Sequence, residues 1–257
     1  SSRGISFIGP ADGEQACGDV GPGRMVEPDN ILNLIASSTK TGPLSGKVIT
    51  ITAGPTREQI DPVRFISNNS SGKMGYALAE AAIELGASVN LVSGPVSLNA
   101  DKSINLHKVN SASEMSESVN KFMKSSDIFI GCAAVSDFKP LDYSSIKIKK
   151  EDLVNPEIEL EMNTDILSNV ANTYKSSFVV GFAAETSDVA NNAKKKLKTK
   201  NLDMIISNDV SDKSIGFDVD ENEVNVITLN ETIFLKKDKK IRIAREILKI
   251  IAKNTKN

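Results

Sequence analysis

Histidine is almost absent from this sequence, which has one among 257 residues, and cysteine occurs only twice. A single histidine, His107, excludes a multi-histidine metal centre and argues against a histidine-based catalytic triad. Cys17 and Cys132 lie far apart and lack metal-ligand spacing, which is typical of a reducing compartment without disulfides. Chemistry would therefore depend on lysine, asparagine, aspartate, backbone N–H groups and a bound cation, a set that suits nucleotidyl or phosphoryl transfer.

The sequence also lacks long apolar runs and a strong net charge. No run approaches the roughly twenty residues of a membrane span, and no signal-peptide core is visible. A net charge of −2 weighs against broad affinity for nucleic acids, because such binding normally needs a basic surface. We expect a cytoplasmic protein without nucleic-acid or membrane partners, and any polyanion that it binds should be small.

Apolar β runs alternate with helical patterns through most of the chain. This alternation predicts a Rossmann-like α/β fold, a mainly parallel sheet with helices on both faces. A pair of strands near the C-terminus predicts a hairpin addition at the sheet edge. The expected strands are 47–52, 88–93, 105–109, 128–133, 158–162, 178–183, 204–207, 224–228 and 232–235, and the expected helices are 74–85, 113–124, 165–174, 187–200 and 240–253.

Residues 37–45 lack apolar periodicity and contain Gly42 and Pro43, so they are predicted to be a linker. The main domain is expected to span residues 46–257. The chain begins with Ser1 rather than methionine, and its first ten residues resemble the interior of a longer sequence. We therefore expect a fragment of a larger protein.

About twenty polar residues connect the first predicted strand to its helix, far more than the two to six that are usual in α/β folds. Such a loop is expected to be functional or disordered. It ends in Ser70, Ser71, Gly72 and Lys73 at the helix start, where backbone N–H groups and the helix dipole favour an anion. The spacing is neither a Walker A loop nor a dinucleotide fingerprint. The alternative is a serine-capped helix after a mobile loop.

The same loop carries a resemblance to a known family. The runs 52–58, 60–68 and 70–75, TAGPTRE, IDPVRFISN and SSGKMG, closely resemble phosphopantothenoylcysteine synthetase of coenzyme A biosynthesis. The resemblance implies a ligase that joins 4′-phosphopantothenate and L-cysteine through an acyl-cytidylate, with CTP and Mg²⁺, in a homodimer. CTP follows from the bacterial fused arrangement of this family, and ATP is the alternative. The metal ligands are not identifiable from the sequence.

A second resemblance concerns the glycine-rich segment 16–25, ACGDVGPGRM. It resembles the substrate clamp at the end of phosphopantothenoylcysteine decarboxylase, the flavin enzyme fused ahead of the synthetase in many bacteria. The cysteine matching Cys17 is a proton donor there. Because the FMN-binding portion is missing, residues 1–36 are expected to be a remnant of the fused decarboxylase domain and Cys17 to be idle. FMN would belong only to the missing half.

The nucleotide site is expected where a buried strand opens into the loop 133–140. Asp137 would accept hydrogen bonds from a ribose or base, or help to hold a cation, and its alternative role is a loop cap. Thr164 stands where many relatives have proline and is expected to cap the next helix. By resemblance, the nucleotide-binding residues are Gly131, Cys132, Ala133, Asp137, Lys147, Asn163, Thr164, Asp165, Ile166, Phe182, Lys196 and Lys200.

Two residues are expected to be catalytic. Lys147 matches the family's mobile lysine loop, and a lysine that closes over the triphosphate would neutralise the charge developing on pyrophosphate. Asn68 would hold the carbonyl oxygen of the activated acyl group while an amine attacks. Without the resemblance, the lysines would be solvated surface residues and Asn68 a turn residue. The loop that ends at Lys73 is thus expected to form the acyl half of the site.

Two other function classes stay open. An NAD(P)-dependent oxidoreductase would share the strand-loop-helix order, but the G-x-G-x-x-G motif and an acidic residue after the second strand are absent. A nucleotide-binding module without turnover would keep the pocket. Pyrophosphate release distinguishes both from a ligase.

Overall fold

The computed structural model describes residues 8–14, 20–28, 30–31, 42–149, 157–185, 189–209 and 219–255. The chain divides into two compact units, Ser1–Thr41 and Gly42–Asn257. Strands β1 (Ala11–Glu14) and β2 (Val20–Arg24) pair antiparallel in the smaller unit. Cys17 lies outside the described residues, so its idle role stays a prediction.

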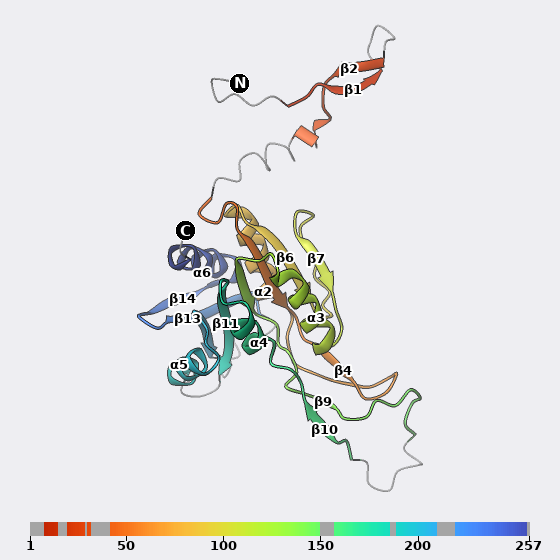
Figure 1. Cartoon of the computed structure of the whole chain (residues 1–257), viewed down its shortest axis with the longest axis vertical. Coiled ribbons are helices and arrows are strands. Elements are labelled where there is room, and N and C mark those ends of the chain that lie inside the picture. Colours follow the sequence, from red (N-terminus) through yellow and green to blue (C-terminus); the bar gives the residue numbers. More distant parts are fainter. Residues whose placement is uncertain are drawn as a thin grey trace. The chain divides into compact units, whose positions relative to one another are not determined.

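The larger unit contains an eight-stranded sheet in the order β14-β13-β12-β11-β8-β3-β6-β7 (Figure 1). All pairings from β12 to β7 are parallel, whereas β12–β13 and β13–β14 are antiparallel. The predicted fold class, including the C-terminal hairpin, is confirmed. The strands are β3 (Val48–Ala53), β6 (Ser88–Ser93), β7 (Asn105–Lys108), β8 (Ile128–Gly131), β11 (Phe178–Glu185), β12 (Met204–Asp209), β13 (Glu221–Thr228) and β14 (Thr232–Lys239).

Successive strand residues point to opposite sides of the sheet, so strands rich in apolar residues make both faces apolar. Helices cover each of these faces. Helices α2 (Lys73–Glu84) and α6 (Lys240–Asn254) supply Leu78 and Ile247 to one apolar cluster. Helices α3 (Ala112–Met123), α4 (Ile166–Thr173) and α5 (Val189–Thr199) supply Met115, Val170 and Leu197 to the other. The two clusters form the core and hold the carboxyl ends of the parallel strands in fixed positions.

The long connection between β3 and α2 is more regular than predicted. It contains an antiparallel hairpin of β4 (Arg57–Gln59) and β5 (Phe65–Ser67), so the expectation of a loop without secondary structure is wrong. The turn of this hairpin depends on Asp61, whose side chain accepts the backbone N–H groups of Val63 at 2.8 Å and Arg64 at 2.9 Å. Strands of three residues are too short to show a periodic apolar pattern.

The predicted strand 158–162 does not belong to the main sheet. Its ordered part, β10 (Leu160–Met162), pairs antiparallel with β9 (Phe138–Pro140) to form the β9–β10 arm, which projects away from the sheet in Figure 1. All of β10 is exposed, which explains the error, because apolar composition alone does not separate a buried strand from an exposed one. Strand β4 packs beside β9.

The larger unit includes the end of the predicted linker. Leu44 is fully buried in the core, and its backbone N–H donates to the carbonyl oxygen of Leu85 at 3.1 Å. Ordered structure of this unit therefore begins at Gly42, whereas residues 32–41 lie outside the described part of the chain. Among the helices that are described, none combines the length and the apolar character needed to cross a bilayer.

Candidate active site

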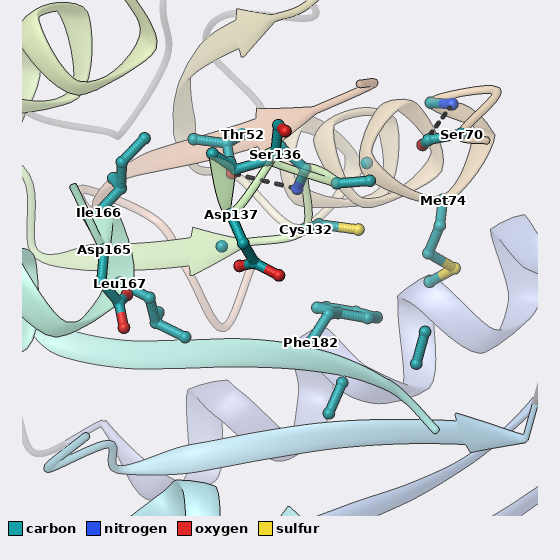
Figure 2. A pocket seen from close by; sticks show the side chains of 18 of the residues that line it. Thr52, Ser70, Met74, Cys132, Ser136, Asp137, Asp165, Ile166, Leu167 and Phe182 are labelled. Atoms are coloured by element: carbon teal, nitrogen blue, oxygen red, sulfur yellow. Dashed lines mark hydrogen bonds between the residues drawn. The ribbon is translucent and has the colours of Figure 1, made fainter. Parts of the chain in front are cut away.

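A cavity of about 440 Å³ opens where four neighbouring parallel strands end. Its wall includes Thr52 of β3, Gly131 of β8, Phe182 of β11 and Asn208 of β12. The carboxyl edge of a parallel sheet is the usual place for ligands in such folds. Figure 2 shows Ser70 and Met74 at one end of this cavity, Asp165 and Leu167 at the other, and Cys132, Asp137 and Phe182 between them.

The start of α2 forms the first end of the cavity. Gly72 is the N-cap residue and has a φ of 76°, a left-handed conformation that favours glycine. No side chain caps this helix, so the serine-capped alternative is wrong. The backbone N–H groups of the first turn carry no side-chain cap, and together with the positive dipole end they favour an anion in the cavity.

Lys73 adds a positive charge at this end. Its Nζ atom contacts Asp220 Oδ1 at 2.9 Å, and the hydrogen bond from Lys73 holds the pKa of Asp220 below its usual range. The Asp220 side chain is 84% exposed, so water can replace its part in this ion pair. Lys73 thus places a positive charge at the α2 end of the cavity.

The start of α4 forms the second end. Asp165 is the N-cap residue, and its carboxylate accepts the backbone N–H of Ser168 at 3.0 Å and the Nζ of Lys200 at 2.8 Å. Burial would raise the pKa of Asp165, but these hydrogen bonds outweigh it and lower the pKa. The prediction that Thr164 caps this helix is therefore wrong, because Asp165 is the N-cap residue. Thr164 and Lys196 line the cavity beside it.

Asp137 is the carboxylate in the middle of the cavity (Figure 2). Two hydrogen bonds tie its loop to Asn163, whose Nδ2 donates to Ser136 O at 2.9 Å and whose backbone N–H donates to Asp137 O at 2.8 Å. Within the described residues the Asp137 side chain caps no backbone group, and its carboxylate lines the cavity. The alternative role as a loop cap is not supported.

The cavity offers few protein ligands for a metal ion. In the described part of the chain, no group of three or more histidine, cysteine, aspartate or glutamate residues is arranged to hold one. Mg²⁺ often binds through one or two carboxylates together with substrate phosphates. Asp137 fits that arrangement, because Asp165 is already paired with Lys200.

The Cys132 thiol lines the cavity but is poorly suited to act as a nucleophile. Burial raises the pKa of its thiol to about 12, and the charge of Lys240 offsets this rise only in part. The thiol is therefore protonated at neutral pH, and thiolate is the nucleophilic form of cysteine. This agrees with the prediction that Cys132 is a small packed residue.

Comparison with known proteins identifies the family. The family model for the C-terminal domain of the DNA/pantothenate metabolism flavoprotein matches residues 44–255. The chain belongs to this family. A coenzyme A biosynthesis bifunctional protein CoaBC from Vibrio vulnificus is 49% identical over 253 residues, which cover 98% of this chain and 63% of that protein. CoaBC from Bacillus subtilis is 49% identical over 227 residues, 87% of this chain and 56% of the relative.

Similarity to solved structures supports the same family assignment. The C-terminal domain of a CoaBC protein superposes with a TM-score of 0.71 at 43% identity and covers 82% of this chain and 97% of that domain. A Cab2 mutant in complex with phosphopantothenate-cysteine has a TM-score of 0.69 at 19% identity, covers 89% and 94% of the two chains, and shows the fold alone. The predicted relation to the C-terminal half of the bifunctional protein is confirmed.

Most of the predicted site residues of this family domain come together in the cavity. The four residues at the start of α2 lie at one end, and the segment around Asp165 lies at the other. The predicted residues that line the cavity are Ser70, Ser71, Gly72, Lys73, Gly131, Cys132, Ala133, Asp137, Asn163, Thr164, Asp165, Ile166, Phe182, Lys196 and Lys200.

Asn68 and Lys147 do not line the cavity. Asn68 is exposed, and its Nδ2 donates to the carbonyl oxygens of Ala134 at 3.2 Å and Val135 at 3.0 Å. The Nδ2 group of Asn68, which would hold an acyl oxygen, thus donates to the loop that contains Ala134 and Val135. Lys147 is also exposed, and the loop is fixed at Ile148, whose backbone N–H donates to Asp61 at 3.2 Å.

Several residues of the cavity wall were not predicted. Asn208 is the last residue but one of β12, and the rule that ligands lie beyond parallel strand ends would have identified it. Asn222 and Lys240 come from an antiparallel strand and from a helix start, and no local motif marks them. The other unpredicted lining residues include Met74, Gly75, Ala134, Val135, Ser136, Met162, Leu167, Ala183 and Ala184.

Proposed function

We propose that this chain is the phosphopantothenate–cysteine ligase part of a coenzyme A biosynthesis protein. The observation that carries the proposal is one cavity with an uncapped helix start at one end and the Lys196 and Lys200 pair at the other. Two separate anion-binding ends suit a reaction between two phosphate-bearing molecules. Because the chain covers 63% of its Vibrio vulnificus relative, the activity of a complete bifunctional protein is not assigned to it.

The first step is activation of the acyl substrate. A carboxylate oxygen of 4′-phosphopantothenate attacks the α-phosphorus of CTP, the bond from this phosphorus to the bridging oxygen breaks, and pyrophosphate leaves. Lys196 and Lys200 offset the charge of the triphosphate and of the leaving pyrophosphate. Mg²⁺ held by Asp137 and the phosphates would supply further charge neutralisation. The product is an acyl-cytidylate.

The second step forms the amide. The nitrogen of cysteine attacks the acyl carbon, the bond to the CMP oxygen breaks, and CMP leaves with the electron pair while the nitrogen loses a proton. Asn68 holds the acyl oxygen in this step, which requires its Nδ2 to exchange the carbonyls of Ala134 and Val135 for the substrate. The loop of Lys147 closes over the triphosphate in the first step.

Pyrophosphate release tests the proposal. The protein is incubated with Mg²⁺, 4′-phosphopantothenate, cysteine and either CTP or ATP, and pyrophosphate and the nucleoside monophosphate are measured. We expect equal amounts of pyrophosphate, CMP and phosphopantothenoylcysteine with CTP. Faster turnover with ATP would select the alternative nucleotide. No pyrophosphate with either nucleotide would refute the ligase and leave the oxidoreductase or a binding module without turnover.

Single substitutions separate the two steps. Lys147→Gln is expected to slow pyrophosphate release about 100-fold, because one charge that stabilises the transition state is lost. Asn68→Asp is expected to release about one pyrophosphate per site while amide formation falls, so that acyl-cytidylate accumulates. Rapid-quench measurements of both products check these roles. The exposed neighbours Lys149→Gln and Asn69→Asp serve as controls, and equal loss of both steps in Asn68→Asp contradicts its assignment.

A homodimer is also part of the proposal. Phe138, Leu160 and Met162 share one face of the β9–β10 arm and are 46%, 50% and 70% exposed. The opposite face carries an ion pair between Lys139 and Glu161 at 3.0 Å. An apolar face this exposed is typical of a surface that a partner covers. In a second copy of the chain, the same face would pair with itself about a two-fold axis.

Sedimentation checks the dimer. The double substitution Phe138→Glu and Leu160→Glu is expected to convert a dimer to a monomer and to reduce turnover at least tenfold, since buried charges at an interface are costly. Lys139→Ser and Glu161→Ser on the opposite face of the arm serve as the control and should keep the dimer mass. A fully active monomer in the unsubstituted protein would contradict this part.

A further inference from the structure

The cavity wall beside α2 contains two buried polar side chains from the C-terminal part of the chain. Asn222 of β13 is 3% exposed and Lys240 of α6 is 6% exposed, and both line the cavity. A register shift between Asn222 and Val224 interrupts the pairing of β13 with β14. Such bulges re-aim side chains next to active sites, and this one places Asn222 against Met74 in the first turn of α2.

The amide of Asn222 has a weak partner in the protein. Its oxygen accepts the backbone N–H of Glu223 at 3.1 Å, which leaves the NH₂ group for the cavity side. That group contacts the sulfur of Met74 at 4.0 Å, and a thioether is a poor acceptor. A buried donor with so weak a partner is costly unless a ligand completes its hydrogen bonds.

Lys240 presents an ammonium group at the same place. Its Nζ donates to the backbone carbonyl of Val219, and its backbone N–H donates to Asp220 O at 2.9 Å, which fixes the first residue of α6. The ammonium carries three N–H donors and no acceptor. Together with Asn222 and the uncapped start of α2, it makes this end of the cavity a set of hydrogen-bond donors.

We propose that Lys240 and Asn222 bind the oxygens of a substrate phosphate at the α2 end of the cavity. This inference rests on the proposed ligase function, because that reaction brings two phosphate-bearing molecules to one cavity. The phosphate is that of 4′-phosphopantothenate or one of the triphosphate of CTP, and the two sources share the same chemistry. Both residues bind substrate and take no part in bond breaking.

The test measures affinity for each substrate separately. Lys240→Met and Asn222→Leu are expected to weaken binding of CTP or of 4′-phosphopantothenate about 10- to 100-fold, the range for a hydrogen bond to a charged group. Binding of pantothenate, which has no phosphate, should change less than twofold if the acyl substrate is the source. Isothermal titration calorimetry gives the dissociation constants, and steady-state kinetics gives KM and kcat.

Two further variants keep the result interpretable. Lys240→Arg retains the charge and should recover most of the lost affinity, and Lys253→Met removes an exposed lysine of the same helix and should change nothing. Unchanged affinity for both phosphate-bearing substrates in folded Lys240→Met and Asn222→Leu proteins would overturn the inference. Failure of the unsubstituted protein to bind or convert either substrate would instead refute the ligase function.

Discussion

Replacing Gly94 by alanine is expected to lower the free energy of unfolding by about 3 kcal/mol, the upper end of the usual cost of overpacking. A β-carbon at this position would lie 1.7 Å from the carbonyl oxygen of Pro55. Pro55 also forms a β-bridge with Ala134, and the Ala134 N–H donates to Gly54 O at 2.9 Å. Displacement of Pro55 therefore moves the loop that carries the hairpin and the loop that lines the cavity.

Urea unfolding and pyrophosphate release check this expectation together. Gly131→Ala is a graded comparison, because its β-carbon would lie 3.1 Å from the flexible side chain of Leu167. Gly21→Ala is the control, since no atom lies within 4 Å of the added carbon. We expect the loss of unfolding free energy to be largest in Gly94→Ala, smaller in Gly131→Ala and smallest in Gly21→Ala. Wild-type stability and turnover in Gly94→Ala would show that Pro55 can move without cost.

The alternation of strands and helices was predictable because each element is long and is buried on a defined face. Helix α2 shows this most clearly, since Leu78, Ala81 and Ala82 recur at helical spacing and all are fully buried. The strands of the parallel sheet have the same advantage, because both of their faces are covered. Local pattern and tertiary structure agree in these elements, and most of the predicted strand and helix ranges of the main sheet were therefore correct.

The candidate site was predictable in part for a similar reason. The segments around Gly72, Cys132 and Asp165 each follow or precede a strong strand or helix pattern, so their position at the sheet edge follows from the fold. The resemblance to the synthetase family selected particular side chains within them. The preference of the helix start at Gly72 for an anion follows from the helix dipole, which is a property of the backbone. It can therefore be predicted wherever a helix start is predicted.

Long-range pairing was not predictable from local sequence. The contact of Asn222 with Met74 joins residues that are 148 positions apart. The contact of Ile148 with Asp61 spans 87 positions. Neither end of these pairs carries a pattern that specifies its partner. The β9–β10 arm has the same property, because its short strands pair with each other outside the main sheet.

Asp61→Asn is expected to lower the melting temperature by several degrees at pH 7 and to reduce turnover together with it. The Asp61 side chain exposes no surface, and its Oδ2 accepts Arg64 Nε at 2.9 Å in addition to the backbone groups of the turn. Arg64 in turn donates from Nη2 to Ile148 O at 2.9 Å. Asparagine has one acceptor oxygen, so it cannot serve the turn, the guanidinium and the Ile148 N–H at once.

The pH dependence of this effect has a definite sign. The side-chain hydrogen bond from Arg64, with those from the backbone, holds the pKa of Asp61 well below its usual range despite the opposing effect of burial. A carboxylate whose pKa is lower in the folded state stabilises the protein fully above its unfolded pKa, which is about 4, and loses this effect as the pH falls further. The melting-temperature difference between Asp61→Asn and wild type should therefore be constant from pH 7 to about pH 5 and shrink below pH 4.

The same substitution tests whether the turn positions the lysine loop. Without the Asp61 carboxylate, Ile148 loses the acceptor of its N–H, and the peptide bond after Lys147 should be cleaved by trypsin several times faster. Asp101→Asn is the control, because that carboxylate is exposed and accepts the backbone N–H and the hydroxyl of Ser103 in its own turn. A difference in melting temperature that is the same at pH 7 and pH 3, with unchanged cleavage after Lys147, would contradict the role of Asp61. If both changes occur, the hairpin turn and the loop that carries Lys147 form one structural unit that depends on Asp61.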